Sequence, residues 1–346
     1  MNIARFYNMD KLDLTVEFLT PTFLGGADQQ GELRSPPFKN LLRQWWRLAN
    51  GNLSVEQLRI KEGELFGTVL GDNECSASRV KIALFRNDSF KQSQNPFRLG
   101  ETKHPEVKGG LPVKNSLYLG YGPVLFAKPE PTCRQYIVPG STATLRLSFP
   151  RSHRDEIIRA VQYIDAFGAI GSRCRNGYGS LALTAQGLER LDLADISAAH
   201  VNELVGNNAK EYPNRFGRDA RLLLWESALQ NQWTNAMTLL AGTYLRTRTH
   251  ISIAGEEIQK RHALGYPVTH HSVDAWGGGN GRMPSQLRLM VKRDRNNGLV
   301  ARILHLPHKL PKQWPTNLPS QLQVWEQVHH YLDNHENQFH RIGGVA

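Results

Sequence analysis

The amino-acid sequence predicts an α+β fold whose first half has the element order strand, helix, two strands, helix and strand. Leu12–Leu19 has the residue pattern of a strand, and Pro21 stops it. Apolar residues then recur at helical spacing within Phe38–Ala49. A glycine-rich loop, Gly168–Gly179, leads into a further strand at Leu181–Thr184. This order is that of a split β-α-β, ferredoxin-like unit.

The first long helix follows a short run of helix-start signals. Pro36 and Pro37 suit the first turn of a helix, and Ser35 precedes them as a candidate cap. The other elements predicted for the first half are helices over Ser54–Phe66 and His153–Phe167, strands over Ser78–Phe85, Ser116–Phe126 and Ala143–Phe149, and a long polar loop over Arg86–Asn115.

The second half begins in the polar stretch between Glu189 and Arg218. Asp294–Gly298 (DRNNG) is a good hairpin signal between two apolar runs. The halves share a rough order of elements but no residue-level repeat, so two diverged copies of one unit stay a hypothesis. The predicted elements are a strand over Ala220–Trp225, a helix over Ser227–Leu245, strands over Gln286–Arg293 and Leu299–Leu306, and a closing helix over Gln321–Phe339.

The composition is that of a globular protein with an excess of positive charge. The chain has 346 residues, enough for two domains that each bury a core. Hydrophobic residues make up 40% and charged residues 21%, which excludes an intrinsically disordered chain. The net charge of +11 points to an anionic partner: nucleic acid, a membrane surface or an acidic protein.

A membrane location and a disulfide framework are both disfavoured. No run approaches the roughly 20 apolar residues of a spanning helix, and MNIARFYNMDKLDL at the start has no apolar signal core. Cys75, Cys133 and Cys174 are odd in number, far apart and without a CxxC pair. We therefore predict a reducing, cytoplasmic location.

The first candidate site is the loop and helix within Thr20–Arg47. Between Arg34 and Val55 there is no acidic residue, whereas basic residues recur there, three of them four apart on one helix face. Like charges at that spacing repel, and an external polyanion would relieve the repulsion. The basic row consists of Arg34, Lys39, Arg43 and Arg47.

The same segment offers further groups to a nucleic acid. Gly25 and Gly26 allow close backbone approach, and the following helix start has free N–H groups for phosphate. Trp46 lies beside the basic row, where it has the place to stack on a base. In the alternative reading both tryptophans are core and the arginines are a solvated face; for Trp45 we predict burial.

The second candidate site is the glycine-rich loop itself. No acidic residue occurs from Ala166 to Leu188, and the loop carries Arg173 and Arg175 with Gly177 and Tyr178. Such a loop either wraps a phosphate as a backbone nest or braces a neighbouring strand. It precedes a strand, so it is not a dinucleotide fingerprint, and the chain has no Walker GK[ST] ending.

The third candidate site lies in the second half. Histidines with an aspartate in an irregular stretch suit metal binding or proton transfer, although their spacing matches no standard zinc pattern, and backbone contact with RNA is the other reading. The residues are Arg246, Arg248, His250, His262, His270, His271, Asp274 and Arg282.

These segments resemble a known family. TPTFLGGADQQGELR followed by SPPFKNLLRQWWR resembles the amino-terminal signature of the RAMP superfamily, RNA-binding subunits of CRISPR effector complexes. FGAIGSRCRNGYGSL is similar to its glycine-rich loop. More narrowly, the chain is similar to the first, backbone-capping RAMP subunit of the type III-B Cmr complex, and RMPSQLRLMVKR shares part of this similarity. Asn40 and Phe167 depart from the pattern, each at a place where glycine is frequent, and neither removes a positive charge.

The resemblance implies two ferredoxin-like (RRM-like) β-α-β-β-α-β domains with long inserted loops, divided as residues 1–190 and 191–346. It also implies a subunit at one end of a protein–crRNA filament, which holds the 3′ part of the crRNA and/or the paired target RNA and docks on other RAMP subunits. That subunit binds rather than cuts RNA, so the expectation includes no catalytic residue, metal, cofactor or small-molecule substrate.

Two other functions stay open. An RNA endonuclease would use Asp28 with a metal ion, or His250 or His271 without one. A structural adaptor would use its charge to contact an acidic protein. For the leading hypothesis, the expected RNA-binding residues are Gly25, Gly26, Arg34, Lys39, Arg43, Trp46, Arg47, Arg173, Arg175, Gly177, Tyr178, Arg246, Arg248, His271 and Arg282.

Overall fold

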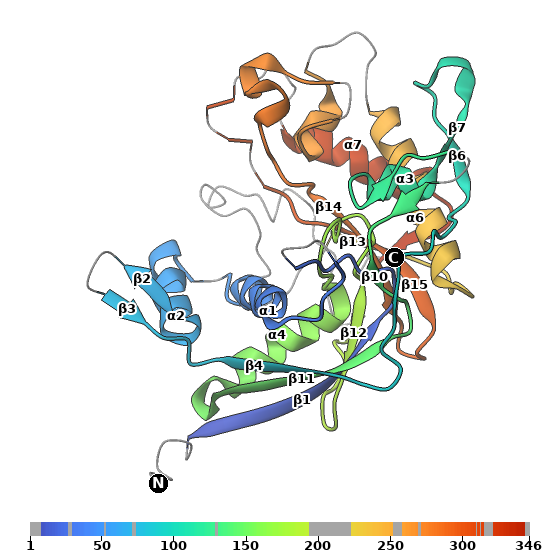
Figure 1. The fold of residues 1–346 in the computed structure, drawn as a ribbon. Helices are drawn as coiled ribbons and strands as arrows, with labels where there is room; N and C mark the ends of the chain where they lie inside the picture. The colour runs from blue at the N-terminus through green and yellow to red at the C-terminus, as the bar shows by residue number, and fades with distance from the viewer. Residues whose placement is uncertain are drawn as a thin grey trace.

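Two antiparallel four-stranded sheets carry the fold in this computed structural model (Figure 1). The first sheet contains β1 (Met9–Phe18), β4 (Lys81–Arg86), β11 (Thr142–Pro150) and β12 (Leu181–Thr184). The second contains β13 (Leu223–Ser227), β14 (Leu287–Arg293), β15 (Leu299–His305) and β16 (Phe339–Arg341). The structure describes residues 8–26, 30–51, 53–70, 74–128, 131–193, 223–251, 258–268, 271–308, 310–311, 313–314 and 321–342.

Each sheet belongs to a run of strand, helix, two strands, helix and strand. In the first run α1 (Ser35–Ala49) and α2 (Val55–Phe66) follow β1, and α4 (Arg154–Phe167) follows β11. In the second, α6 (Trp233–His250) follows β13 and α7 (Gln321–Asn334) follows β15. The sheet orders are β12-β1-β11-β4 and β14-β15-β13-β16, so in both runs the first strand lies between the third and the fourth. The predicted α+β class is confirmed.

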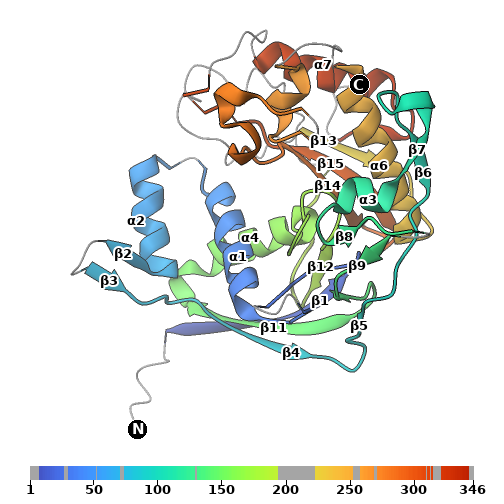
Figure 2. The same cartoon turned by 45° about the horizontal axis from the view of Figure 1, so that its top comes forward.

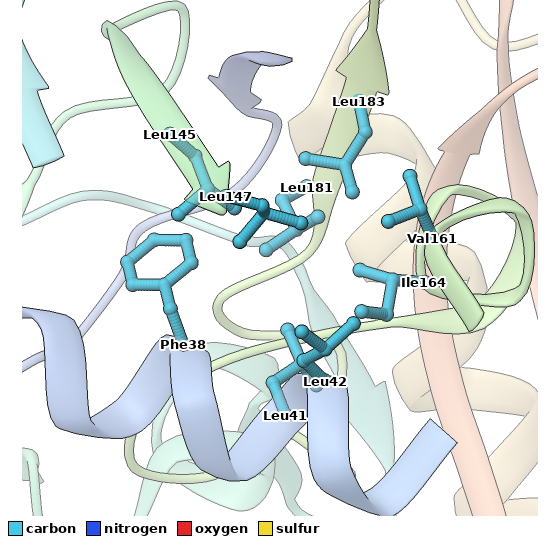
Figure 3. A pocket seen from close by; sticks show the side chains of 9 residues that line it. All are labelled: Phe38, Leu41, Leu42, Leu145, Leu147, Val161, Ile164, Leu181 and Leu183. Atoms are coloured by element: carbon cyan, nitrogen blue, oxygen red, sulfur yellow. The ribbon is translucent and has the colours of Figure 1, made fainter. Parts of the chain in front are cut away.

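The first core lies between the first sheet and the helices α1 and α4, which cover the same face (Figure 1). Leu12, Leu14, Val16 and Phe18 of β1 are buried, while the residues between them are exposed or half-buried, as strand alternation requires. Apolar side chains of α1 point at the sheet and at α4, and the gap left among them has a volume of about 10 Å³ (Figure 3). Since this gap is apolar and barely the size of one water molecule, it is a packing defect and not a ligand site.

The second sheet is buried on both faces. One face packs against α6 and α7, where Leu289, Val291 and Ile303 contact apolar helix residues. The other face contributes Met290 and Leu304 to the first core, beside α4. This explains why β15 is buried at every position after Leu299 and shows no alternation.

Two buried cations join the second sheet to the end of α4. Lys292 of β14 is fully buried, and its Nζ donates to the carbonyl oxygens of Ile164 (3.0 Å), Gly168 (2.6 Å) and Leu181 (2.7 Å). Arg302 of β15 donates to the carbonyl of Ala166 at 3.1 Å. Positive charge at a helix C-terminus satisfies its unpaired carbonyls and opposes the helix dipole, so this contact fixes the two sheets against each other.

One predicted strand of the first half is wrong. Ser116–Phe126 instead forms α3 (Asn115–Gly120) and the short strand β8 (Val124–Leu125). Asn115 at the start of α3 accepts a hydrogen bond from Thr102, and Leu119 is buried in the second core. A short apolar run fits the residue spacing of a helix as well as that of a strand, and packing against α6 decides for the helix.

The predicted polar loop 86–115 also contains strands. These are β5 (Gln92–Ser93), β6 (Glu101–Lys103) and β7 (Pro112–Lys114). Other short strands outside this stretch are β2 (Thr68–Leu70), β3 (Glu74–Ser76), β9 (Thr132–Cys133) and β10 (Tyr136–Ile137). β6 and β7 form a hairpin that lies, together with α3, along α6 (Figure 2). Strands of two or three residues are too short to leave a periodic signal in the sequence.

The ends of several elements differ from the prediction. Arg34, not Ser35, is the N-cap of α1, and no side chain caps it. Pro36 and Pro37 have no N–H group that needs an acceptor, so the helix starts without one. In α2, by contrast, Ser54 and Gln57 form a capping box. The predicted closing helix stops early, and β16 pairs with β13 in its place.

Candidate nucleic-acid interface

The loop after β1 and the glycine-rich loop meet in the folded chain. The Ser172 N–H donates to the Phe23 carbonyl at 2.9 Å, and the Gly179 N–H donates to the Pro21 carbonyl at 3.1 Å. The Thr20 hydroxyl donates to the Gly177 carbonyl at 2.8 Å, across 157 positions of sequence. The glycine-rich loop therefore braces neighbouring backbone, one of the two roles predicted for it.

The loop also reaches the second sheet, where Asn176 bridges to Leu289 of β14. This packing buries two residues that we expected to contact RNA. Tyr178 is fully buried and its hydroxyl donates to the Ser116 carbonyl at 2.9 Å. A Cβ at Gly177 would lie 2.5 Å from the sulfur of Met237. Both residues hold the loop in place, and their assignment as RNA contacts is wrong.

The basic row on α1 is partly neutralised from α2. Arg43 and Arg47 both hydrogen-bond to the Glu62 carboxylate, which is almost buried. The two guanidinium groups share one negative charge, so the repulsion between them is largely relieved without a polyanion. Burial lowers the pKa of Lys39, and Arg43 lowers it further. Arg34 is exposed at the start of the helix.

The two tryptophans of α1 belong to the core. Trp45 is buried and stacks on Phe167, with ring centroids 5.8 Å apart, as predicted. Trp46 is equally buried, packs edge-on against Phe66, and its Nε1 donates to Glu156 at 2.9 Å. The suggested stacking of Trp46 on a base is therefore wrong, because α4 and α2 cover both its ring and its polar edge.

Glu62→Gln is expected to lower the free energy of unfolding by about 1 kcal/mol, the upper range for half-exposed ion pairs. The reason is that two adjacent guanidinium groups, 39% and 43% exposed, would lose their common counter-charge. Urea unfolding measures the change. Glu64→Gln on the exposed side of the same helix is the matched control. Equal stabilities for the two variants would contradict the assigned role of Glu62.

A large cavity gathers cations from the other two candidate sites. It has a volume of about 1210 Å³ and lies between the β6–β7 hairpin, α3, the glycine-rich loop, α6 and the 261–285 segment. The RNA contacts expected from sequence that line it are Arg173, Arg248, His271 and Arg282. The second and third candidate sites thus share one cavity, whereas the basic row of α1 is not part of its lining.

Arg173 has the backbone geometry to reach this cavity. Its φ of 58° is in the left-handed region, and a Cβ at Gly122 would lie 3.6 Å from its Nη2. Burial lowers the pKa of Arg173, while Tyr244 and Tyr121 raise it. No ion pair of Arg173 occurs within the described residues. It therefore lines the cavity as a cation without a carboxylate partner in that part of the chain.

Arg261 is a cavity residue that sequence reasoning missed. It is 4% exposed, and its Nη1 donates to both oxygens of Glu106 at 2.8 Å. Its neighbour His262 is structural: its Nδ1 accepts from the Gln259 N–H at 2.8 Å, and burial lowers its pKa to about 4. Arg261 stands in an irregular stretch without periodicity, so no sequence signal marked it.

Arg246 does not join the cavity. Its Nε and Nη2 donate to the two oxygens of Glu336 at 2.8 and 2.6 Å, and Glu336 is itself buried. Arg246 and Arg248 are two positions apart on α6, so they project to different sides of the helix. Arg246 forms this ion pair with 47% of its side chain exposed, and its role as an RNA contact stays a prediction.

A second pair of cations lies where the glycine-rich loop meets β14. Arg175 donates to the Ser285 carbonyl at 3.4 Å, and Arg288 lies over the Trp45 ring at 5.6 Å. Burial lowers the pKa of both groups, that of Arg288 to about 10, and Arg175 adds to the effect on Arg288. Neither has a carboxylate partner in the part of the chain that the structure describes. Arg288 was not predicted.

The family model described as RAMPs, the RAMP superfamily, matches residues 15–182. Just under half of the chain is therefore similar to the RAMP superfamily. The match covers β4 and β11, parts of β1 and β12, and α1, α2, α4 and the glycine-rich loop.

The chain is similar to solved structures over most of its length. The crystal structure of Cmr1 from Pyrococcus furiosus has 17% identity and a TM-score of 0.49, with 94% of this chain and 97% of that chain covered. A chain in the cryo-EM structure of the type III-B Cmr-beta bound to cognate target RNA has 12% identity and a TM-score of 0.44, with 93% and 99% covered. Among curated proteins, none matches this chain.

Three further candidate residues have partners within the protein. Gly25 bridges to Gly31, and the Gly26 N–H donates to the Gln30 carbonyl at 3.2 Å. His250 packs against Tyr331 with ring centroids 4.4 Å apart. Asp28 and His270 lie outside the described residues.

Two kinds of feature are absent from the part of the chain that the structure describes. There, no group of three or more His, Cys, Asp or Glu side chains is placed to hold a metal ion. Across the same residues, no helix combines the length and apolar character needed to cross a bilayer.

Proposed function

We propose that this chain is a non-catalytic RNA-binding subunit of a type III, Cmr-type CRISPR ribonucleoprotein. In this proposal it caps the complex, holds the 3′ part of the crRNA and/or the paired target RNA, and docks on other RAMP subunits. Its two runs of elements are two ferredoxin-like domains, residues 1–190 and 191–346. The shared strand order of the two sheets supports this division.

One observation carries the RNA-binding part of the proposal: the excess of cations around the cavity. Its lining includes six lysines and arginines and two acidic residues. Arg173 is uncompensated, and Arg175 and Arg288 add two cations where the same loop meets β14. Arg175 and Arg288 are half-buried, and burying cations without carboxylate partners is costly. A phosphate-bearing ligand offsets that cost.

The salt dependence of RNA binding follows from the number of cations that contact phosphates. If Arg34, Arg173, Arg175 and Arg288 each hold a phosphate, affinity for single-stranded RNA should fall about 50-fold between 50 and 200 mM salt. Fluorescence anisotropy with a labelled oligonucleotide measures it. Because phosphate contacts do not read sequence, two oligonucleotides of unrelated sequence should give the same slope. Purification of the chain free of host RNA, with no salt-dependent binding, would contradict RNA binding and favour a protein adaptor.

A further inference from the structure

The cavity is built from parts of the chain that are far apart in sequence. Its walls come from the β6–β7 hairpin, α3 with the following turn, α6 and the 261–285 segment, and the glycine-rich loop supplies Arg173 and Asn176. Ligand pockets of about 300–1,000 Å³ accommodate drug-sized molecules. A cavity of about 1210 Å³ therefore has room for more than one nucleotide.

Arg261 carries hydrogen-bond donors that the described part of the protein leaves without acceptors. Arg261 is 4% exposed, and its Nε and Nη2 have no hydrogen-bond partner among the described residues. Its Nη1 takes both oxygens of Glu106, with His271 as a second neighbour of that carboxylate at 3.7 Å. A buried donor without a partner costs about 1–3 kcal/mol. A phosphate oxygen is an acceptor that suits a guanidinium group especially well.

Aromatic rings line the same space. Tyr118 of α3 and Tyr244 of α6 face each other with centroids 6.2 Å apart, and Arg248 lies over the Tyr244 ring at 5.2 Å. Tyr121 and Phe126, also in the lining, are 61% and 70% exposed. Large apolar rings left in water beside cations are typical of proteins that stack unpaired bases. A base within a duplex has its faces covered by its neighbours, so only an unpaired base can use such rings.

We propose that this cavity holds unpaired nucleotides of the bound RNA, with phosphates on Arg261 and Arg173 and bases stacked on Tyr121 and Phe126. The inference rests on the proposed function and adds to it the form of RNA that is recognised. A peptide occupant is disfavoured because the unsatisfied groups are arginine donors beside aromatic rings, a combination that matches phosphate and base together.

The test compares a single-stranded RNA 15-mer with a blunt RNA duplex of the same length, using the full chain and fluorescence anisotropy. The double variant Tyr121→Ala/Phe126→Ala should weaken single-strand binding at least about 30-fold, given the loss per stacked base in other proteins. Arg173→Asn should weaken it about tenfold, and asparagine suits the left-handed backbone at that position. Duplex binding should change less than twofold in the double variant.

Matched controls are available elsewhere on the surface. Phe85→Ala removes an exposed ring on β4, and Arg59→Gln removes an exposed charge on α2; both should bind single-stranded RNA like the unmodified chain. The substituted cavity residues Tyr121, Phe126 and Arg173 are all exposed. Arg261 is left unchanged because its replacement endangers folding. Circular dichroism checks that each variant is folded.

The outcomes separate the two proposals. Failure of the unmodified chain to bind either RNA would overturn the proposed function and this inference together. Normal RNA binding that the cavity variants leave unchanged would overturn the inference alone. If the cavity variants bind RNA normally but lose a co-purifying protein subunit, the cavity holds a protein, and this result also overturns the inference.

Discussion

Gly179→Ala is expected to destabilise the protein by roughly 4 kcal/mol, a large share of the stability of a typical domain. Gly179 has a φ of 67°, and a Cβ there would lie 1.8 Å from the Ile170 carbonyl oxygen. The left-handed backbone costs an alanine about 1–2 kcal/mol, and forcing an atom into packed surroundings costs about 1–3 kcal/mol more. The Ile170 carbonyl cannot move away freely, because the Ile170 N–H donates to Gly179 at 2.8 Å.

Urea unfolding of the two proteins measures this loss, and Gly140→Ala is its control. Gly140 has a φ of 85°, but nothing lies within 4 Å of a Cβ built there. It should therefore lose only the backbone part, about 1–2 kcal/mol. If both substitutions cost the same, close approach of the two loop strands is not what requires glycine at position 179.

Lys292→Met is expected to lower the free energy of unfolding by about 3 kcal/mol at pH 7. Methionine fills a similar volume, but it leaves the Ile164, Gly168 and Leu181 carbonyls without their shared donor. Each buried polar group that loses its partner costs about 1–3 kcal/mol. Part of the total is offset because the cost of burying the ammonium disappears. Chemical denaturation at pH 7 measures the difference.

The pH dependence of stability provides a second measurement at this residue. Burial lowers the pKa of Lys292 in the folded chain to about 7, with Asp165 acting against the shift. In the unfolded chain the pKa of lysine is about 10.4. Between these values the unfolded state binds more protons, so Lys292 makes stability rise with pH, by at most about 1.36 kcal/mol per pH unit.

Below pH 7 both states hold the proton and this contribution is constant. Lys292→Met should therefore lack the rise in stability from pH 7 to 10 that the unmodified chain shows. Exposed Lys61→Met on α2 is the control, and it should retain the rise. Parallel pH profiles for all three proteins would contradict the lowered pKa of Lys292.

Local sequence patterns were sufficient for most of the fold. The apolar spacing in Phe38–Ala49 predicted which face of α1 is buried, and β12 was predicted with its observed bounds. The helix predicted over Ser54–Phe66 is likewise present as α2, Val55–Phe66. Patterns failed at Ser116–Phe126, because a short apolar run suits either a helix or a strand. Contact with α6 decides for the helix α3.

The candidate site was only partly accessible to sequence reasoning. Arg173 and Arg248 were identified from runs of basic residues, and the fold brings both to one cavity. The same reasoning did not foresee the ion pairs of Arg43 and Arg246, because their partners Glu62 and Glu336 lie 19 and 90 positions away. It overlooked Arg261, whose place in the cavity depends on Glu106, 155 positions earlier.

The sequence by itself determined the α+β class, the buried helix faces, the positions of the glycine-rich turns and the similarity of residues 15–182 to the RAMP superfamily. These depend on backbone geometry and periodicity, which neighbouring residues set. Only the tertiary structure decided which cations are balanced by carboxylates, which aromatic rings are buried, and that Arg173 and Arg261 share a cavity. Charge balance and burial depend on atoms brought together across the chain, and no local pattern records those contacts.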